Sequence, residues 1–90
     1  MKQFTYRIED PNGMHARPAG ALATYAKRFL SDVRVRVKDT EKEVDAKRLL
    51  SLMSLGAVSG SDLVFSVVGS DEDVAASAIE DFCRAQLGGK

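Results

Sequence analysis

Two kinds of hydrophobic spacing follow one another along this 90-residue chain, and their order is the feature that most constrains its fold. Apolar residues alternate with polar ones in stretches that predict strands, and they recur every three or four residues in stretches that predict helices. Strands are expected at residues 2–9, 33–38, 43–46 and 63–68, and helices from near His15 to about Leu30, at 47–55 and at 71–86. The order β-α-β-β-α-β-α predicts one α+β domain over residues 1–90, with helices on one face of an antiparallel sheet. The pattern alone leaves the strand order open between an open-faced sandwich and a ferredoxin-like arrangement.

Two of the predicted helices differ in how their apolar residues are distributed. The first has one apolar face at helical spacing, made of Ala19, Leu22, Ala23, Ala26, Phe29 and Leu30. The second, residues 47–55, carries leucine and methionine around much of its circumference, so part of its apolar surface is expected to stay exposed. Exposed apolar patches mark docking surfaces. The alternative is that all of these side chains belong to the core.

Composition excludes several classes of function. The 13 basic and 13 acidic residues give a formal net charge of zero, so no global field favours nucleic acid or an anionic membrane surface. The N-terminus has no long apolar run, and we expect a cytoplasmic protein without membrane insertion. The single cysteine, Cys83, cannot form an internal disulfide, and its apolar helical surroundings predict a packed thiol.

The stretch that carries chemistry is Asn12-Gly13-Met14-His15-Ala16-Arg17-Pro18, which holds the only histidine. Asn12-Gly13 is a turn signal and Pro18 suits a first helical turn, so His15 is expected at a helix N-terminus. Unpaired N–H groups and the helix dipole favour anions there and disfavour a positive charge on the imidazole. Arg17 adds a planar donor fork that matches phosphate oxygens. These residues predict a nucleophilic imidazole beside an anion site; the alternative is a surface histidine without a special task.

Two motifs carry a resemblance to a known family. One is the stretch from Asn12 to Ala19, and the other is Lys47-Arg48-Leu49-Leu50-Ser51-Leu52-Met53-Ser54-Leu55-Gly56. In this order and at this chain length they resemble the two signatures of the HPr family, the phosphocarrier proteins of the phosphoenolpyruvate-dependent sugar phosphotransferase system. The resemblance covers nearly the whole chain. It implies four antiparallel strands in the order first, fourth, second, third, with three helices on one face.

The resemblance also implies a function and a site. In the HPr family, enzyme I is phosphorylated by phosphoenolpyruvate and donates the phosphoryl group to a histidine, which passes it to sugar-specific IIA proteins. Here the acceptor would be Nδ1 of His15, with Arg17, Asn12 and the N–H groups of Ala16 and Arg17 on the phosphate. The chain would be a stoichiometric carrier and a monomer, not an enzyme, without cofactor or metal. Partners would dock on Gly20, Thr24, Lys27, Arg48, Leu49, Leu50 and Met53.

Other interpretations remain open. Arg48 stands where many low-GC Gram-positive members of the family carry a serine that a kinase phosphorylates, so that regulation is in doubt for this chain. A paralogue in a regulatory phosphorelay would show the same motifs. A ferredoxin-like small-molecule-binding domain would share the element order but would not need His15, Arg17 and Pro18 in this frame. A self-contained enzyme is disfavoured, since the sequence has no acid–base pair, metal-binding cluster or glycine-rich nucleotide loop.

Overall fold

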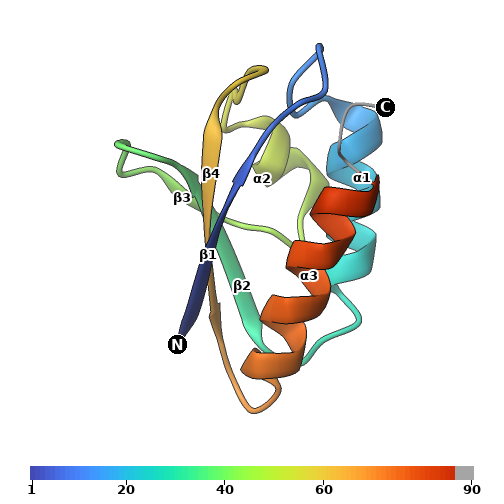
Figure 1. Ribbon diagram of the computed structural model, residues 1–90, viewed down its shortest axis with the longest axis vertical. Coiled ribbons are helices and arrows are strands. Elements are labelled where there is room, and N and C mark those ends of the chain that lie inside the picture. Colours follow the sequence, from blue (N-terminus) through green and yellow to red (C-terminus); the bar gives the residue numbers. More distant parts are fainter. Residues whose placement is uncertain (87–90) are drawn as a thin grey trace.

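A computed structural model describes residues 1–86 and shows a four-stranded sheet with three helices on one face (Figure 1). The strands are β1 (Lys2–Arg7), β2 (Asp32–Val37), β3 (Glu43–Asp45) and β4 (Asp62–Val68), and the helices are α1 (Ala16–Ala26), α2 (Leu49–Met53) and α3 (Glu72–Gln86). The strand order is β1-β4-β2-β3 and all neighbours are antiparallel. This confirms the order implied by the resemblance. Residues 87–90 of the expected domain lie outside the described residues.

The central strand β4 holds the sheet together. It pairs with β1 on one side and with β2 on the other, so that Phe65 lies opposite both Phe4 and Val35. The rings of Phe4 and Phe65 stack with centroids 4.6 Å apart. Leu63, Phe65 and Val67 alternate along the buried face of the strand and are fully covered. The strand predicted at residues 63–68 is therefore confirmed, as β4 over Asp62–Val68.

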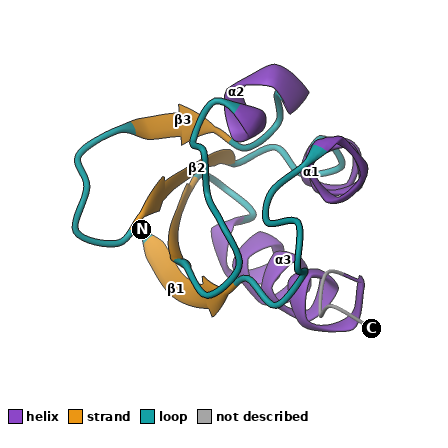
Figure 2. Ribbon diagram, turned by 90° about the horizontal axis from the view of Figure 1, so that it is seen from above, coloured by secondary structure: helices purple, strands orange, loops and turns teal. Residues whose placement is uncertain are grey.

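All three helices cover the same face of the sheet, as the view from above shows (Figure 2). Each contributes fully buried side chains to the single core, including Leu22 from α1, Leu52 from α2 and Ile79 from α3. Cys83 of α3 is also fully buried, and this burial raises the pKa of its thiol to about 12. The thiol is therefore protonated at neutral pH and packs in the core, as the sequence predicted.

The first helix ends earlier than predicted. α1 stops at Ala26, and the N–H groups of Arg28 and Phe29 donate to the carbonyls of Tyr25 and Ala26, three residues back. The chain thus leaves the helix through tight turns. Leu30 is 84% exposed, so the prediction that it lies on the buried face is wrong.

The second helix is also shorter than predicted, running over Leu49–Met53 instead of 47–55. A side-chain oxygen of Asp45 accepts the N–H of Lys47 at 2.9 Å, and Arg48 has an extended backbone. This local turn competes with helix formation over the first two residues of the predicted range. At the other end Gly56 has φ of +64°, a left-handed conformation that commonly follows the end of a helix.

Asp71 joins the loop between α1 and β2 to the start of α3. Its carboxylate accepts hydrogen bonds from the hydroxyl of Ser31 and from the N–H groups of Leu30 and Ser31. The Ser31 hydroxyl, followed by the Leu30 N–H, holds the pKa of Asp71 below its ordinary value. These bonds hold Leu30 and Ser31 outside the helix, which ends at Ala26.

We predict that Asp71→Asn lowers the melting temperature at neutral pH, because one amide oxygen replaces a carboxylate that serves three donors. The folded-state pKa is lowered, so the stabilisation is complete above the unfolded-state value of about 3.9 and is lost as pH falls through the folded-state value. Thermal unfolding followed by circular dichroism should show a gap between wild type and variant that closes in acid. Asp73→Asn, an exposed partner of Lys2, is the control. Equal melting of wild type and Asp71→Asn at neutral pH would contradict this role.

Candidate functional site

Backbone contacts fix the loop that leads from β1 into α1. The N–H of Gly13 donates to the carbonyl of Asp10 at 2.9 Å, and the N–H of Met14 donates to the carbonyl of Ala57 at 3.0 Å. Gly13 has φ of +68°, and a Cβ at this position would lie 2.3 Å from the oxygen of Ala57. Only glycine fits both the conformation and the close approach. The loop is therefore held against the segment that follows α2.

His15 lies at the N-terminus of α1, as predicted. It is the N-cap residue, and its carbonyl accepts the N–H of Ala19 at 3.0 Å, while its side chain makes no capping hydrogen bond. The N–H groups of Ala16 and Arg17 belong to the first helical turn and have no acceptor within the helix, and Pro18 has no N–H. The half-exposed imidazole thus stands beside donors that suit an anion.

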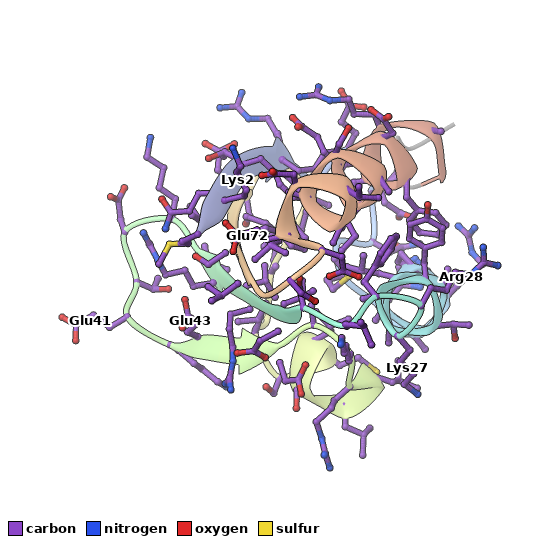
Figure 3. The ribbon with its side chains drawn as sticks, turned by 90° about the horizontal axis from the view of Figure 1, so that it is seen from below. Lys2, Lys27, Arg28, Glu41, Glu43 and Glu72 are labelled. Atoms are coloured by element: carbon purple, nitrogen blue, oxygen red, sulfur yellow. The ribbon has the colours of Figure 1, made fainter. Side chains whose placement is uncertain are left out.

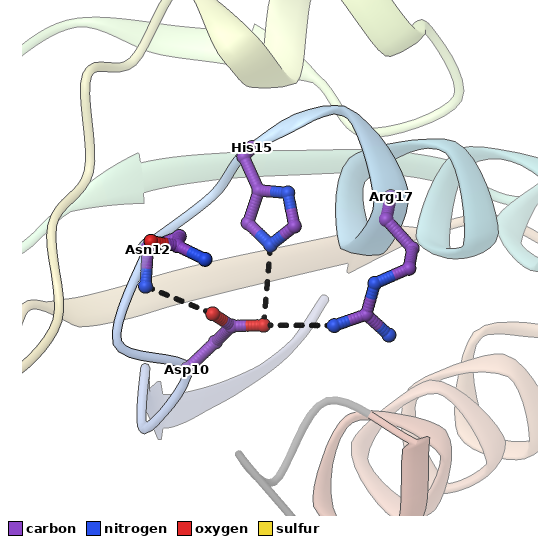
Figure 4. Close-up of polar contacts among 4 residues, drawn as sticks. All are labelled: Asp10, Asn12, His15 and Arg17. Atoms are coloured by element: carbon purple, nitrogen blue, oxygen red, sulfur yellow. Dashed lines mark hydrogen bonds and ion pairs between the residues drawn. The ribbon is translucent and has the colours of Figure 1, made fainter.

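Asp10 is the site residue that sequence reasoning missed (Figure 4). Its Oδ1 accepts the N–H of Asn12 at 2.9 Å, while its Oδ2 lies 3.2 Å from Nε2 of His15 and 3.4 Å from Nη2 of Arg17. The sequence indicated only a turn at Asp10. The carboxylate contacts the imidazole of His15 because that turn reverses the direction of the chain. An acidic side chain five residues before the histidine was the available signal.

The charge of Asp10 is well defined. The hydrogen bond from the N–H of Asn12, followed by the interactions with His15 and Arg17, holds the pKa of Asp10 below its ordinary value. The side chain is 12% exposed and ionised at neutral pH. A carboxylate in this state accepts hydrogen bonds and cannot donate them.

Arg17 lies beside the imidazole because both contact the same oxygen of Asp10. Its side chain is 78% exposed, so the guanidinium has room to turn toward a ligand. Asn12 is exposed, and its N–H is committed to Asp10. The structure therefore brings together His15, Arg17 and the first-turn N–H groups. A phosphate-binding role for Asn12 stays a prediction.

The predicted docking residues of α2 form an exposed apolar patch. Leu50 is 77% exposed, and Leu49 and Met53 are each 39% exposed, whereas Leu52 between them is fully buried. This confirms that the helix keeps part of its apolar surface outside the core. The polar residues Lys27 and Arg48 border the same open hollow as Leu49 and Leu50.

The predicted docking residues of α1 do not all face α2. Lys27 lies on the α2 side, and Arg28 lies on the α3 side of the same helix end (Figure 3). Thr24 lines a second hollow together with Arg28 and Phe82. Gly20 borders that hollow, and a Cβ there would be 4.0 Å from Leu49, so it lies between the two.

Two classes of site are absent from residues 1–86. No helix in this range is both long enough and apolar enough to cross a membrane. The same residues contain no group of three or more His, Cys, Asp or Glu side chains arranged to hold a metal ion.

The chain is similar to known proteins over most of its length. A family model described as the PTS HPr component phosphorylation site matches residues 2–85. The chain is 39% identical over 80 residues to the phosphocarrier protein HPr of Mycoplasma genitalium, covering 89% of this chain and 90% of that protein. It is 36% identical to the multiphosphoryl transfer protein of Vibrio cholerae, covering 93% of this chain and 21% of that protein. A crystal structure of HPr-C-His from Thermoanaerobacter tengcongensis matches with a TM-score of 0.88 and 34% identity, covering 100% of this chain and 99% of that one.

Proposed function

The chain belongs to the HPr family of phosphocarrier proteins, and on that premise we propose that His15 carries a phosphoryl group between proteins of a phosphotransferase system. The donor would be phosphorylated enzyme I, and the acceptors would be IIA proteins that serve sugar uptake. The observation that carries the proposal is the placement of the only histidine at the N-terminus of α1, beside Arg17 and the free donors of the first turn.

The proposed transfer needs little machinery beyond this placement. Nδ1 of His15 attacks phosphorus, forming an N–P bond while the bond between phosphorus and the donor's leaving atom breaks. Phosphoryl transfer depends mainly on alignment and on stabilisation of the phosphate charge. That stabilisation would come from the N–H groups of Ala16 and Arg17 and from the Arg17 guanidinium. The side-chain amide of Asn12 would be a further donor.

A carrier must also release its phosphoryl group. The donors at this site come from one exposed arginine and one helix end, not from a deep cage of cations. Interactions of this kind are weakened by solvent, so they orient the phosphate without trapping it. We infer that the chain works as a stoichiometric carrier, in keeping with its family, and that it does so as a cytoplasmic monomer.

Docking is proposed on the surface formed by α1 and α2. Leu49, Leu50 and Met53 provide exposed apolar anchors, and Lys27 and Arg48 provide positive charge at their border. Apolar anchors with a charged rim suit brief encounters with acidic protein surfaces, because the charges raise the rate of association. Thr24 and Gly20 would extend this surface along α1.

The first prediction of the proposed function concerns the residue that is phosphorylated. Incubation with phosphoenolpyruvate and enzyme I from the same organism should add one phosphate to the wild-type chain, as measured by intact-mass spectrometry. The adduct should be labile in acid and stable in alkali, as expected of a phosphohistidine, and His15→Ala should show none. A phosphate on His15→Ala, or none on folded wild-type protein, would contradict the proposed function.

The second prediction concerns Arg17. We expect Arg17→Ala to accept phosphate about tenfold or more slowly, because a hydrogen bond to a charged group is lost from the transferring phosphate. Stability should hardly change, since the Arg17 side chain is 78% exposed and solvent weakens its ion pair with Asp10. Arg34→Ala, which removes an exposed arginine of β2, is the matched control. Unfolding of Arg17→Ala, or transfer at the wild-type rate, would count against the assigned role.

The third prediction concerns the docking patch. Leu50→Asp should slow transfer from enzyme I by about tenfold or more, because a charge replaces an apolar anchor at the interface. The matched control is Val74→Asp, which places the same charge at an exposed apolar position of α3. Stopped-flow or rapid-quench measurement of transfer compares the two. Equal rates for both variants would remove the patch from the docking surface.

A further inference from the structure

Asp10 contacts the reacting imidazole on the side opposite to its proposed acceptor atom. Building on the proposed function, we propose that Asp10 is a positioning residue that holds the proton of His15 on Nε2 and so presents the lone pair of Nδ1 for phosphorylation. The two carboxylate oxygens of Asp10 make different kinds of contact. One contacts a backbone donor and the other contacts the ring and Arg17.

The backbone contact fixes the direction of the carboxylate. Oδ1 accepts the N–H of Asn12 at 2.9 Å, which leaves Oδ2 facing Nε2 of His15 at 3.2 Å. An ionised carboxylate only accepts hydrogen bonds, so Nε2 must be the donor. A neutral imidazole carries one N–H, and its other nitrogen then has a free lone pair. That nitrogen is Nδ1, which lies on the side of the ring toward α1 (Figure 4).

The same contact keeps the protons balanced through the transfer cycle. When Nδ1 attacks phosphorus, the ring becomes an imidazolium that bears the phosphoryl group on Nδ1 and the proton on Nε2. The negative charge of Asp10 then faces this positive ring across the hydrogen bond. When the phosphoryl group moves on, the N–P bond breaks and its electron pair returns to Nδ1. The ring is neutral again with its proton still on Nε2, so no proton has to leave or enter.

Asp10→Asn provides a sharp test because it keeps the shape and changes the hydrogen-bonding pattern. The single amide oxygen can serve either the N–H of Asn12 or the ring. The backbone N–H cannot change, whereas the ring can change tautomer and the exposed Arg17 can turn away. The oxygen should therefore stay on Asn12 and the NH₂ group should face Nε2, which moves the ring proton to Nδ1 and blocks the acceptor atom.

The direct measurement is ¹⁵N NMR of histidine-labelled protein, at a pH alkaline enough for the ring to be neutral. His15 is the only histidine, so its ring nitrogens are assigned without ambiguity. We expect the proton on Nε2 in wild type, on Nδ1 in Asp10→Asn, and on both sites in Asp10→Ala. Asp45→Asn is the matched control, because Asp45 on β3 makes the same backbone contact two residues ahead. Its spectrum should match that of wild type.

Transfer kinetics give a second readout. We expect Asp10→Asn to be phosphorylated about tenfold more slowly than wild type and more slowly than Asp10→Ala, although it is the closer replacement in shape. A merely structural role would predict the reverse order. A proton on Nδ1 in wild type, a proton that stays on Nε2 in Asp10→Asn, or wild-type transfer by Asp10→Asn would overturn the proposal. The NMR result needs no phosphoryl donor, so it stands apart from any failure of the proposed function.

Discussion

The hydrogen bond from the N–H of Met14 to the carbonyl of Ala57 holds the start of α1 against the segment that follows α2. Gly13 makes this approach possible, since a side chain there would collide with Ala57. Because the contact is made by backbone atoms, it places the helix N-terminus independently of the side chains around it. His15, the first-turn donors and the neighbouring patch on α2 therefore keep a fixed relation to the sheet.

The charges around His15 include groups that attract a phosphate and one group that repels it. The helix N-terminus and Arg17 attract it, whereas the carboxylate of Asp10 repels it. The repulsion is limited because Asp10 faces Nε2, the nitrogen opposite to the proposed acceptor. The carboxylate would instead stabilise the positive ring that the proposed phosphorylation of Nδ1 creates. On the proposed function, such a site would hold the phosphoryl group loosely, which suits a protein that passes it on.

Hydrophobic spacing predicted which segments form strands and helices, because the residues of each segment carry the pattern of its buried face. The apolar patterns predicted the strand at residues 63–68 and the helix at 71–86, and Cys83 is fully buried as expected. The end of α1 and the start of α2 were predicted wrongly. Hydrogen bonds to Asp71 and Asp45 hold the neighbouring residues outside these helices, and hydrophobic spacing does not reveal such bonds. The strand order came from the resemblance alone, since the periodicity fits two arrangements.

The site could be predicted only in part, for the same reason. Asn12-Gly13 and Pro18 placed His15 at a helix start, because turn and helix-entry signals are local. The contact between Asp10 and the ring forms only after the turn closes, so its chemistry was not visible in the linear pattern. The exposed side of α2 could be predicted, because leucine and methionine residues spread around a short helix cannot all face the core.

The most direct test of the account is to locate the phosphorus on the ring after phosphorylation. Coupling between ³¹P and ¹⁵N in histidine-labelled protein identifies the nitrogen that bears the phosphoryl group. The account predicts that phosphorus is bonded to Nδ1 of His15, with a proton on Nε2. A phosphoryl group on Nε2, or on any residue other than His15, would contradict it.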